Sequence, residues 1–572
     1  MQFDITPDNK PYLDGRGKII LNACPGSGKT TAIAYKLGAL VKECEQTYGP
    51  YAGIACLSFT NTATEEIASK FRGLTNSYLS FPHSVSTLDS FINRYITLPF
   101  YYLMGKPSKR PIILDVVSFL DEMNLGYFPA KSKQPLVRIL QPSKLKFEST
   151  GEISWNGNRP KAQTVDLAIF DKYAATFKNW QLNNGYLNND DSTYIAFRLL
   201  NKFPSIADDL VQRFPYFIID EAQDTSEIQY KIFDILIAAG LTNIEYVGDP
   251  YQSLYEFREA RPDLFLARFA DTANWKPLRL KDCRRTSQQI INAYSLFRSP
   301  AEVSIISSCK HTTDHRLKVL RYDPANLSDL ISRYEALIDI TKENYILVRG
   351  STHLEMFGAK FSSEQPWKHG AARSLVDAQQ FYNGGNVKSA VDTLRKFLVE
   401  IQVPAADRKE QWNLREKMKE DLDVNIQLFE FLRRMPSIDD TLEAWTKKVV
   451  DFIYSELNVT IDLQLKQKGK AFYALNLKAL LYPEINVDYP VTTIHKVKGM
   501  TFHSVLLVLS ENSTAANISL SEFKKPTGLP SEKQRMIYVA LSRPEAMACI
   551  AVPNTIGEEK VKEYLGNDIE FA

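Results

Sequence analysis

Residues 18–31 read KIILNACPGSGKTT, and this stretch decides the fold. Its first part, KIILN, is short, apolar and β-branched, which is typical of a buried strand. Its second part, ACPGSGKTT, is a glycine-rich turn that ends in Lys29, Thr30 and Thr31, and the amphipathic stretch 30–43 (TTAIAYKLGALVKE) follows. A strand, a glycine-rich turn with Lys-Thr and then a helix form the context that a phosphate-binding loop requires.

The chemistry of this turn suits a nucleoside triphosphate. Gly26 and Gly28 let the backbone turn so that several N–H groups face one point, which the N-terminus of the next helix also faces. Lys29 adds a positive charge for the β- and γ-phosphates, and Thr30 offers a hydroxyl to Mg²⁺. Ala23 stands in place of the first glycine of the strict motif. A glycine-rich turn with a solvated lysine is the weaker alternative, because it does not explain the flanking strand and helix.

A second segment, FIIDEAQD at 217–224, supplies carboxylates. An apolar strand ends there in two acids, so Asp220 and Glu221 are expected at the carboxyl edge of a sheet, where ligands bind in open α/β folds. Asp220 would hold Mg²⁺ through water, and Glu221 would polarise the attacking water. Helix capping is the alternative for this segment, and it is expected to apply to Asp224 or Thr225.

Further apolar runs between turn residues predict more buried strands. They fall into two groups, before about residue 270 and after about residue 275, and comprise 53–58, 216–220, 244–248, 345–348 and 504–509. Amphipathic stretches alternate with these strands, which is the α/β pattern. The sequence therefore predicts two domains, each built on a parallel sheet.

Two long stretches interrupt the strand groups. Residues 96–189 are irregular in composition, and residues 366–485 are mostly helical by periodicity. We therefore expect an α/β fold of two parallel-sheet domains, each with an inserted, largely helical subdomain. The predicted division is a first domain of residues 1–95 and 190–272 with the insertion 96–189, and a second domain of residues 273–365 and 486–572 with the insertion 366–485.

Composition narrows the function classes. Over 572 residues, 69 Lys+Arg against 67 Asp+Glu give a formal net charge of +2, so a histone-like excess of basic residues is excluded, although a local basic groove is not. Six cysteines without a CxxC pair argue against a disulfide scaffold or a zinc site built on cysteine pairs. Without a signal peptide or an apolar run of about 18 residues, we expect a soluble, cytoplasmic protein with no membrane partner.

Seven further segments appear in a characteristic order after the phosphate loop. They are SFTNTATEEI (58–67), STLDSFINRYI (86–96), FIIDEAQDTSEIQ (217–229), YVGDPYQSLYEFREA (246–260), LKDCRRTSQQI (280–290), TIHKVKGMTF (493–502) and EKQRMIYVALSR (532–543). In this order they resemble the UvrD/Rep/PcrA family of superfamily 1 DNA helicases. The resemblance covers nearly the whole chain and implies two RecA-like domains, each with an insertion.

The resemblance implies roles at an ATP and Mg²⁺ site. The catalytic set would be Lys29, Asp220, Glu221, Gln252 as sensor of the γ-phosphate, and Arg284 and Arg543 as the arginines that the second domain points at it. Thr30 and Asp220 would hold Mg²⁺. The nucleotide would contact Asn9, Ala23, Pro25, Gly26, Ser27, Gly28, Lys29, Thr30, Thr31 and Gly499.

The resemblance also implies a single-stranded DNA path across the two domains. The positions that match strand contacts are Phe59, Thr60, Asn61, Thr87, Tyr255, Phe257, Arg258 and His495. Aromatic rings stack on bases without reading sequence, and the family moves 3′ to 5′ along the strand. Each residue also has an ordinary structural interpretation, for example a core position for the phenylalanines.

Several positions depart from the family pattern. Asn9 stands where a glutamine usually reads adenine, and Cys283 where a tyrosine usually stacks on it. Thr501 replaces a glutamate after the KG of motif V, and Asp89 replaces a histidine beside the expected DNA path. The changes at Asn9 and Cys283 concern the base and not the phosphates, so triphosphate hydrolysis is expected more firmly than a strict preference for ATP.

Two functions are therefore carried forward. The first is a DNA-dependent ATPase that translocates 3′ to 5′ on single strands and unwinds duplex junctions. The second is a nucleotide- and DNA-sensing subunit that regulates a partner nuclease, since the chain also resembles the helicase-like subunit of the Gabija anti-phage system. A small-molecule kinase with a phosphate-binding loop would leave the downstream segments without a role.

Overall fold

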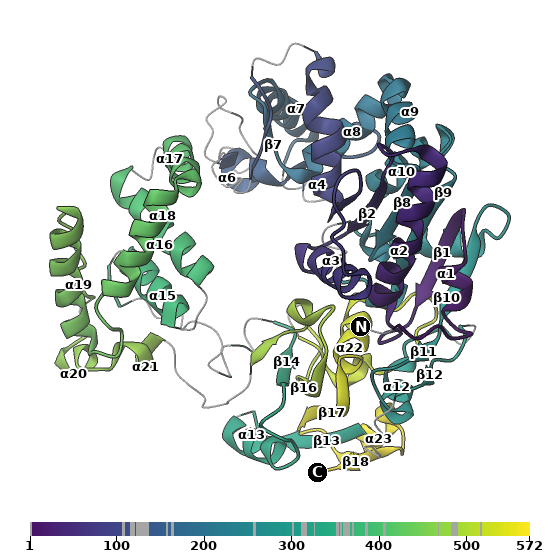
Figure 1. Ribbon diagram of the computed structural model, residues 1–572. Coiled ribbons are helices and arrows are strands. Elements are labelled where there is room, and N and C mark those ends of the chain that lie inside the picture. The colour runs from purple at the N-terminus through teal and green to yellow at the C-terminus, as the bar shows by residue number, and fades with distance from the viewer. Residues whose placement is uncertain are drawn as a thin grey trace. The chain divides into compact units, whose positions relative to one another are not determined.

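The computed structural model describes residues 3–105, 109–114, 120, 121, 128, 136–155, 158–161, 165–254, 259–299, 302–309, 317–324, 326–350, 354, 357, 366–368, 371–383, 387–403, 408–466, 468–481, 490–514 and 517–572. The chain divides into two compact units (Figure 1). The first comprises Met1–Asp115, Leu125–Gly350 and Asp488–Ala572, and the second comprises Val116–Asn124 and Ser351–Val487. The first unit contains both parallel sheets, and the described residues of the second unit contribute no strand to either sheet.

The first sheet has six strands in the order β10-β1-β9-β8-β2-β3. All neighbours pair in parallel. The strands are β1 (Lys18–Ala23), β2 (Ile54–Ser58), β3 (Ser84–Thr87), β8 (Tyr216–Asp220), β9 (Asn243–Gly248) and β10 (Lys276–Leu280). Parallel sheets are covered on both faces, which explains why β1, β2, β8 and β9 are nearly continuous apolar runs.

The two faces of this sheet bury different residues. Along β1, Ile19 and Leu21 pack with helices α2 (Lys29–Tyr48) and α3 (Asn61–Thr75). Ile20 points to the opposite face and packs with α8 (Asn189–Lys202) and α10 (Glu227–Ala238). This alternation follows from the two-residue period of a strand, and it fixes the carboxyl edge of the sheet between two helical layers.

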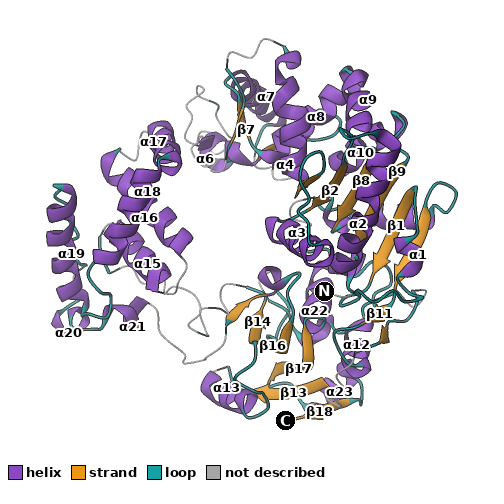
Figure 2. Ribbon diagram, in the orientation of Figure 1, coloured by secondary structure: helices purple, strands orange, loops and turns teal. Residues whose placement is uncertain are grey.

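The second sheet also has six parallel strands, in the order β15-β14-β16-β17-β13-β18. They are β13 (Leu317–Tyr322), β14 (Asn344–Val348), β15 (Val491–Thr493), β16 (Phe502–Val508), β17 (Pro544–Pro553) and β18 (Ile569–Phe571). Its core includes α12 (Gln288–Ser295) and α22 (Glu532–Leu541), whose start is held by a capping box between Ser531 and Gln534. The predicted α/β class with two parallel sheets is confirmed (Figure 2).

The region predicted as the first insertion contains a long helix and small strand pairs. Helix α7 (Leu167–Asn183) lies beside the antiparallel pair β5 (Leu145–Phe147) and β6 (Ile153–Trp155). Its buried ion pair joins Lys178 to Asp191 at 2.7 Å. These elements belong to the same compact unit as both sheets, so the four-part domain division stays a prediction.

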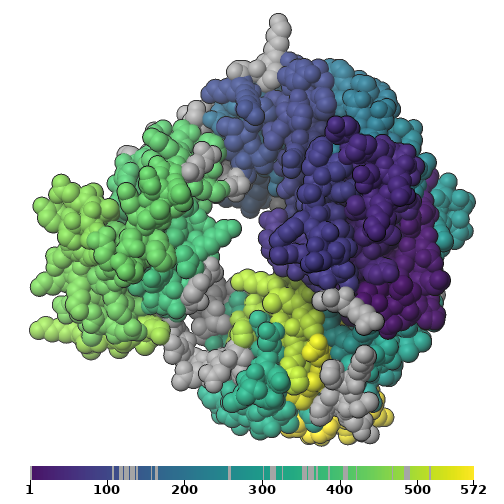
Figure 3. Space-filling model, in the orientation of Figure 1, coloured from purple at the N-terminus to yellow at the C-terminus, as the bar shows by residue number. Residues whose placement is uncertain are grey.

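The second unit is helical in its described residues. Its helices are α15 (Ala371–Asn383), α16 (Val387–Gln402), α17 (Arg408–Glu420), α18 (Leu422–Arg434), α19 (Leu442–Leu457), α20 (Lys470–Tyr473) and α21 (Leu477–Leu481). They pack as one body (green in Figure 3) around the buried rings of Trp367 and Trp445, 5.6 Å apart. Within the described part of the chain, we find no helix with the length and apolarity needed to cross a membrane.

Candidate nucleoside triphosphate site

The glycine-rich turn lies between the end of β1 at Ala23 and the start of α2 at Lys29. Gly26 and Gly28 have φ angles of 73° and 80°, a backbone region that residues other than glycine rarely adopt. A Cβ atom at Gly26 would also lie 2.6 Å from the Cβ atom of Arg285. The first N–H groups of α2 have no partner within the helix, so the turn presents an anion-binding concavity.

Lys29 is held by two carboxylates at the end of β8. Its Nζ lies 3.2 Å from Oδ1 of Asp220 and also pairs with Oε1 of Glu221. Burial alone would lower the pKa of Lys29, but the charges of Asp220 and Glu221 outweigh it and raise the pKa above its ordinary value. The lysine is therefore fully charged in the state without nucleotide.

The residues at this point fit a bound Mg²⁺. Asp220 is buried at the carboxyl end of β8, and its carboxylate lines the cavity beside Lys29. The hydroxyl of Thr30, on the first turn of α2, lines the same cavity. A carboxylate and a hydroxyl are oxygen ligands of the kind that Mg²⁺ prefers. Among the described residues, no group of three or more His, Cys, Asp or Glu side chains could hold a metal ion, so the protein ligands offered here are Asp220 and Thr30 alone.

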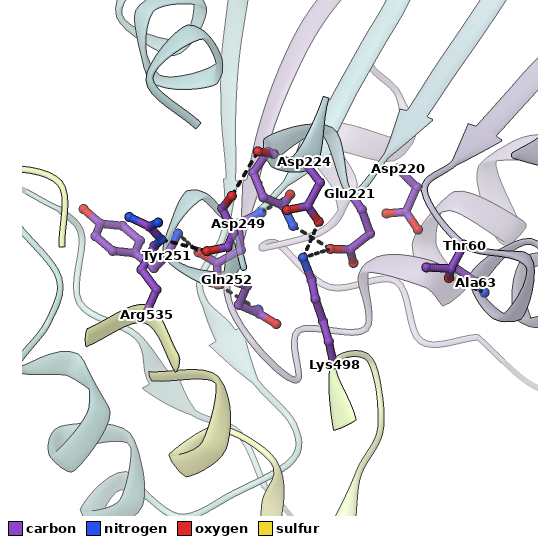
Figure 4. Close-up of polar contacts among 12 residues, drawn as sticks. Thr60, Ala63, Asp220, Glu221, Asp224, Asp249, Tyr251, Gln252, Lys498 and Arg535 are labelled. Atoms are coloured by element: carbon purple, nitrogen blue, oxygen red, sulfur yellow. Dashed lines mark hydrogen bonds and ion pairs between the residues drawn. The ribbon is translucent and has the colours of Figure 1, made fainter. Parts of the chain in front are cut away.

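Glu221 follows Asp220 in a left-handed backbone conformation, with φ 54° and ψ 37°. Its Oε2 accepts a hydrogen bond of 2.5 Å from Nε2 of Gln223 and lies 3.4 Å from Nζ of Lys498 (Figure 4). Burial would raise the pKa of Glu221, but Lys29 and Lys498 outweigh it and hold the pKa well below its usual range. The carboxylate is thus ionised and fixed in direction.

Two residues of this network were not identified from the sequence. Gln223 is fully buried, and its Oε1 accepts a hydrogen bond from the backbone N–H of Asp249 at 3.1 Å. Lys498 pairs with Asp224 as well as with Glu221. The letters DEAQD and KVKG contain both residues, but only the folded chain brings them together.

The expected cap of α10 is corrected by the structure. The capping residue is Ser226, whose hydroxyl accepts from the N–H of Gln229, and neither Asp224 nor Thr225 caps the helix. Asp224 instead faces Lys498, and burial raises its pKa to about 6. A capping box needs a Ser or Thr at the cap and a Glu or Gln three residues later. Ser226 and Gln229 meet this requirement at the start of α10.

Gln252 and Arg543 join the two sheets of the first unit. Nη2 of Arg543, which follows α22, donates to Oε1 of Gln252 at 2.7 Å, and Nε2 of Gln252 donates to Oδ2 of Asp249 at 2.8 Å. Burial, together with the charge of Arg285, lowers the pKa of Arg543 to about 9, which leaves the guanidinium charged at neutral pH. Nη1 of Arg543 also donates to the carbonyl oxygen of Met500 at 3.3 Å.

A cavity of about 180 Å³ brings together most of the predicted phosphate-site residues. Its lining contains Lys29, Asp220, Glu221, Gln252 and Arg543. A neighbouring cavity of about 500 Å³ adjoins it at the glycine-rich turn. Of the ten predicted nucleotide contacts, the first cavity is lined by Ala23, Pro25, Gly26, Ser27, Gly28, Lys29, Thr30 and Gly499, and the second by Asn9 and Thr31 together with residues 26–28.

The prediction that Arg284 faces the γ-phosphate with Arg543 is corrected. Arg285 lines the smaller cavity and donates from Nη1 to the carbonyl oxygen of Ser542 at 2.7 Å, while Arg284 lines the larger cavity. Successive side chains of an extended segment point to opposite sides, so a shift of one residue exchanges the two roles. By the same shift, Cys283, expected at the base-stacking position, is fully buried in the core of the second sheet.

Asn9 differs from the expectation that its amide reads the base. Its Nδ2 donates to the carbonyl oxygen of Asp4 at 2.9 Å, and its Oδ1 accepts from the N–H of Thr6 at 2.9 Å. Both ends of the amide thus brace the loop before α1 (Lys10–Leu13). Asn9 and Arg284 both line the larger cavity, and of the two the amide of Asn9 is engaged by its own loop.

The described DNA-contact candidates lie at the ends of strands. Ser58 at the end of β2 pairs with Thr87 at the end of β3, so Phe59, Thr60 and Thr87 share the carboxyl edge of the first sheet. Thr60 caps α3 and Thr87 caps α4 (Leu88–Ile92) through their hydroxyls. These two hydroxyls therefore have a structural role as helix caps, whether or not they also contact DNA.

The other residues predicted on or beside the DNA path lie in different elements or outside the described part of the chain. Asn61 is exposed at the first position of α3, and His495 is half-buried in the second sheet's domain, 4.0 Å from Glu532. Asp89 accepts a hydrogen bond from Gln229 at 3.2 Å. Tyr255, Phe257 and Arg258 lie outside the described residues.

Comparison with known proteins identifies the first half of the chain. Residues 7–273 match the family model of the UvrD/REP helicase N-terminal domain. The ATP-dependent DNA helicase PcrA of Staphylococcus epidermidis (strain ATCC 35984) is 25% identical over 406 residues, which cover 66% of this chain and 51% of PcrA. The chain thus spans about half the length of such curated relatives. The resemblance predicted from the motifs is confirmed.

Two other relatives match over most of their length. A probable DNA helicase II homolog of Mycoplasma genitalium is 22% identical over 627 residues, which cover 96% of this chain and 84% of the relative. The Gabija protein GajB of Bacillus cereus (strain VD045) is 21% identical over 533 residues, which cover 90% of this chain and 92% of GajB.

Proposed function

We propose that this chain, whose residues 7–273 form a UvrD/REP helicase N-terminal domain, is an ATP-dependent DNA motor that moves 3′ to 5′ on single strands and unwinds duplex junctions. One observation carries the proposal. Lys29 and Glu221, at the carboxyl edge of the first sheet, line a single cavity behind the glycine-rich turn together with Arg285, which follows the short strand β11 (Asp282–Cys283), and Arg543, which precedes β17 of the second sheet. A triphosphate in that cavity would be contacted from both walls.

The residues of the chain divide the work of hydrolysis. The N–H groups of the turn and Lys29 bind the β- and γ-phosphates, and Thr30 and Asp220 hold Mg²⁺, which when bound offsets the charge on the phosphate oxygens. Glu221 accepts a proton as the oxygen of water bonds to the γ-phosphorus and the bond from phosphorus to the bridging oxygen breaks. Arg285 and Arg543 stabilise the charge that develops on the transferred group.

The same arrangement supports movement. The arginines belong to one sheet's domain and the lysine to the other, so loss of the γ-phosphate removes the charge that holds the two walls together. The strand would lie along the carboxyl edge of the first sheet, where Phe59, Thr60 and Thr87 lie. The proposed strand contacts are Phe59, Thr60, Asn61, Thr87, Tyr255, Phe257, Arg258 and His495. Repeated closing and opening then advances the strand, with bases stacking on the aromatic rings.

A second function is favoured by one comparison. The match to GajB covers about nine-tenths of both chains, whereas the match to PcrA covers half of PcrA. This supports the alternative that the chain is a nucleotide- and DNA-sensing subunit that regulates a nuclease in an anti-phage complex. Either function places the protein with DNA in the cytoplasm.

The decisive experiment is strand separation by the purified chain on a duplex with a 3′ single-stranded tail. Unwinding that requires nucleoside triphosphate and disappears in Lys29→Ala supports the motor. Unwinding or nucleotide turnover that appears only after a co-purifying nuclease is added supports the alternative. Triphosphate hydrolysis at an unchanged rate in Lys29→Ala would exclude both, since both place the phosphates at Lys29.

A further inference from the structure

Lys498 reaches from the second sheet's domain to the carboxylates at the end of β8. Its side chain is 8% exposed, and its Nζ pairs with Asp224 and lies 3.4 Å from Oε2 of Glu221. Figure 4 shows Lys498 approaching both acids, on the side of Glu221 away from Asp220. Glu221 is the residue that would accept the proton from water, so a cation at this position bears directly on the reaction.

Both oxygens of the Glu221 carboxylate are occupied. Oε1 pairs with Lys29, while Oε2 takes the hydrogen bond from Gln223 and the charge of Lys498. A triphosphate attracts Lys29 away from Oε1 because the phosphates carry more negative charge. The triphosphate does not attract Gln223 and Lys498 in the same way. These two residues therefore still determine whether Oε2 of Glu221 is available to a water molecule.

The segment that carries Lys498 touches several parts of the site at once. It begins with the short helix η8 (Ile494–Val497), which contains the proposed strand contact His495. Gly499 follows with a φ angle of 84°, which permits a sharp change of direction, and lines the smaller cavity. The carbonyl oxygen of Met500 accepts from Arg543. Residues 494–500 therefore connect the proposed DNA contact His495 with Glu221 and Arg543.

We propose that Lys498 is a positioning residue that withholds Glu221 from water until strand binding moves residues 494–500. Without a strand, Lys498 holds Oε2 of Glu221 and keeps the carboxylate turned from the γ-phosphate. A strand bound at His495 shifts the segment about Gly499 and moves Lys498 away from Oε2 of Glu221, while Lys498 keeps its pair with Asp224. Hydrolysis thereby becomes dependent on DNA. This inference rests on the proposed hydrolysis and assigns its regulation by DNA to Lys498.

A purely structural role for Lys498 would be to neutralise two buried acids, and the two interpretations differ in a measurable way. If Lys498 only supports the fold, Lys498→Met and Asp224→Asn both weaken the site and both lower hydrolysis. If Lys498 withholds Glu221, Lys498→Met frees the base, whereas Asp224→Asn keeps the charge of Lys498 beside Glu221. The two variants then change strand-independent hydrolysis in opposite directions.

The experiment measures nucleoside triphosphate hydrolysis by the full chain, with and without single-stranded DNA. We expect Lys498→Met to raise the strand-independent rate about tenfold, equivalent to 1.4 kcal/mol of barrier, and to remove most of the stimulation by DNA. Asp224→Asn should lower the strand-independent rate and keep the stimulation. Lys498→Arg, which keeps the charge, should behave like the unchanged chain. Lys496→Met removes the charge of an exposed lysine two residues away and should leave the strand-independent rate unchanged.

Thermal unfolding of each variant shows whether it is folded, and Lys498→Gln, which also removes the charge, takes the place of Lys498→Met if that variant does not fold. Equal losses in Lys498→Met and Asp224→Asn, or an unchanged stimulation ratio in Lys498→Met, would overturn the inference while Lys29-dependent hydrolysis remains intact. Absence of hydrolysis in the unchanged chain, with and without DNA, would overturn the proposed function and the inference with it.

Discussion

Arg543 and Gln252 are joined by a hydrogen bond of 2.7 Å, from Nη2 of the arginine to Oε1 of the amide. The arginine follows α22 beside the second sheet, and the glutamine ends the turn after β9 of the first sheet. Gln252 is also bound to Asp249, which accepts from the hydroxyl of Tyr538 on α22 at 3.1 Å. Gln252, the proposed sensor of the γ-phosphate, is therefore linked directly to Arg543.

Arg543 should act on the chemical step more than on binding. In Arg543→Lys, a charge remains but the planar fork that contacts both Gln252 and the phosphoryl oxygens is lost. We expect kcat to fall about a thousandfold, with a much smaller change in KM, because an arginine of this kind stabilises charge that develops in the transition state. Steady-state hydrolysis measures both constants. A rise in KM at constant kcat would contradict this assignment.

Neighbouring arginines should separate into two kinetic classes. Arg285 lines the cavity that holds Lys29, and Arg284 lines the larger cavity on the other side of the glycine-rich turn. Arg285→Ala should lower kcat about a hundredfold. Arg284→Ala should raise KM with little change in kcat, because it contacts the part of the nucleotide that does not react. The reverse pattern would restore the assignment made from the sequence.

A buried ion pair behind the phosphate loop should be important for stability. Nζ of Lys36 on α2 lies 2.5 Å from Oε1 of Glu245 on β9 and 4.2 Å from the ring centre of Tyr12, and both charged side chains are almost fully buried. Lys36→Met leaves a buried carboxylate without its cation, so we expect a loss of about 3–5 kcal/mol. Urea unfolding measures the loss.

The double variant Lys36→Met/Glu245→Leu serves as its control. It replaces both charges by apolar groups and should recover most of the stability that Lys36→Met loses. If the single and double variants were equally unstable, the cause would be packing and not the uncompensated charge.

Asp224 should give the protein an unusual pH dependence. Burial raises its pKa to about 6 in the folded chain, against 3.8 for an exposed aspartate. The folded state therefore binds this proton more tightly, so the stability it contributes is present below pH 3.8 and is lost as the pH rises through 6. Relative to Asp224→Asn, the unchanged chain should lose about 2 kcal/mol between pH 4 and pH 7, which is most of the full effect at 1.36 kcal/mol per pKa unit.

Unfolding of both proteins in urea at several pH values measures that difference. Subtracting the Asp224→Asn curve removes the contribution of every other carboxylate. A difference that stays constant between pH 4 and pH 7 would show that Asp224 keeps its ordinary pKa.

Much of the fold could be predicted because its signals are local. The strands at 18–22, 216–220 and 345–348 are apolar runs that a parallel sheet buries on both faces, and each appears within two residues of its predicted bounds. The edge strands β3, β10, β15 and β18 were not predicted, because an edge strand is partly exposed and its residues do not form a continuous apolar run. The central strands β13 and β17 were also missed, although both are mostly buried.

By itself, the sequence determined the phosphate-binding turn, the acids at the end of β8 and the α/β class, since each depends on residues that are neighbours in the chain. The folded chain alone shows that Arg285 and not Arg284 shares a cavity with Lys29, and that Lys498 reaches Glu221. These relationships depend on the side to which one side chain points and on contacts between residues more than 200 positions apart. Such contacts are set by how the two sheets pack, and no local pattern of letters records them.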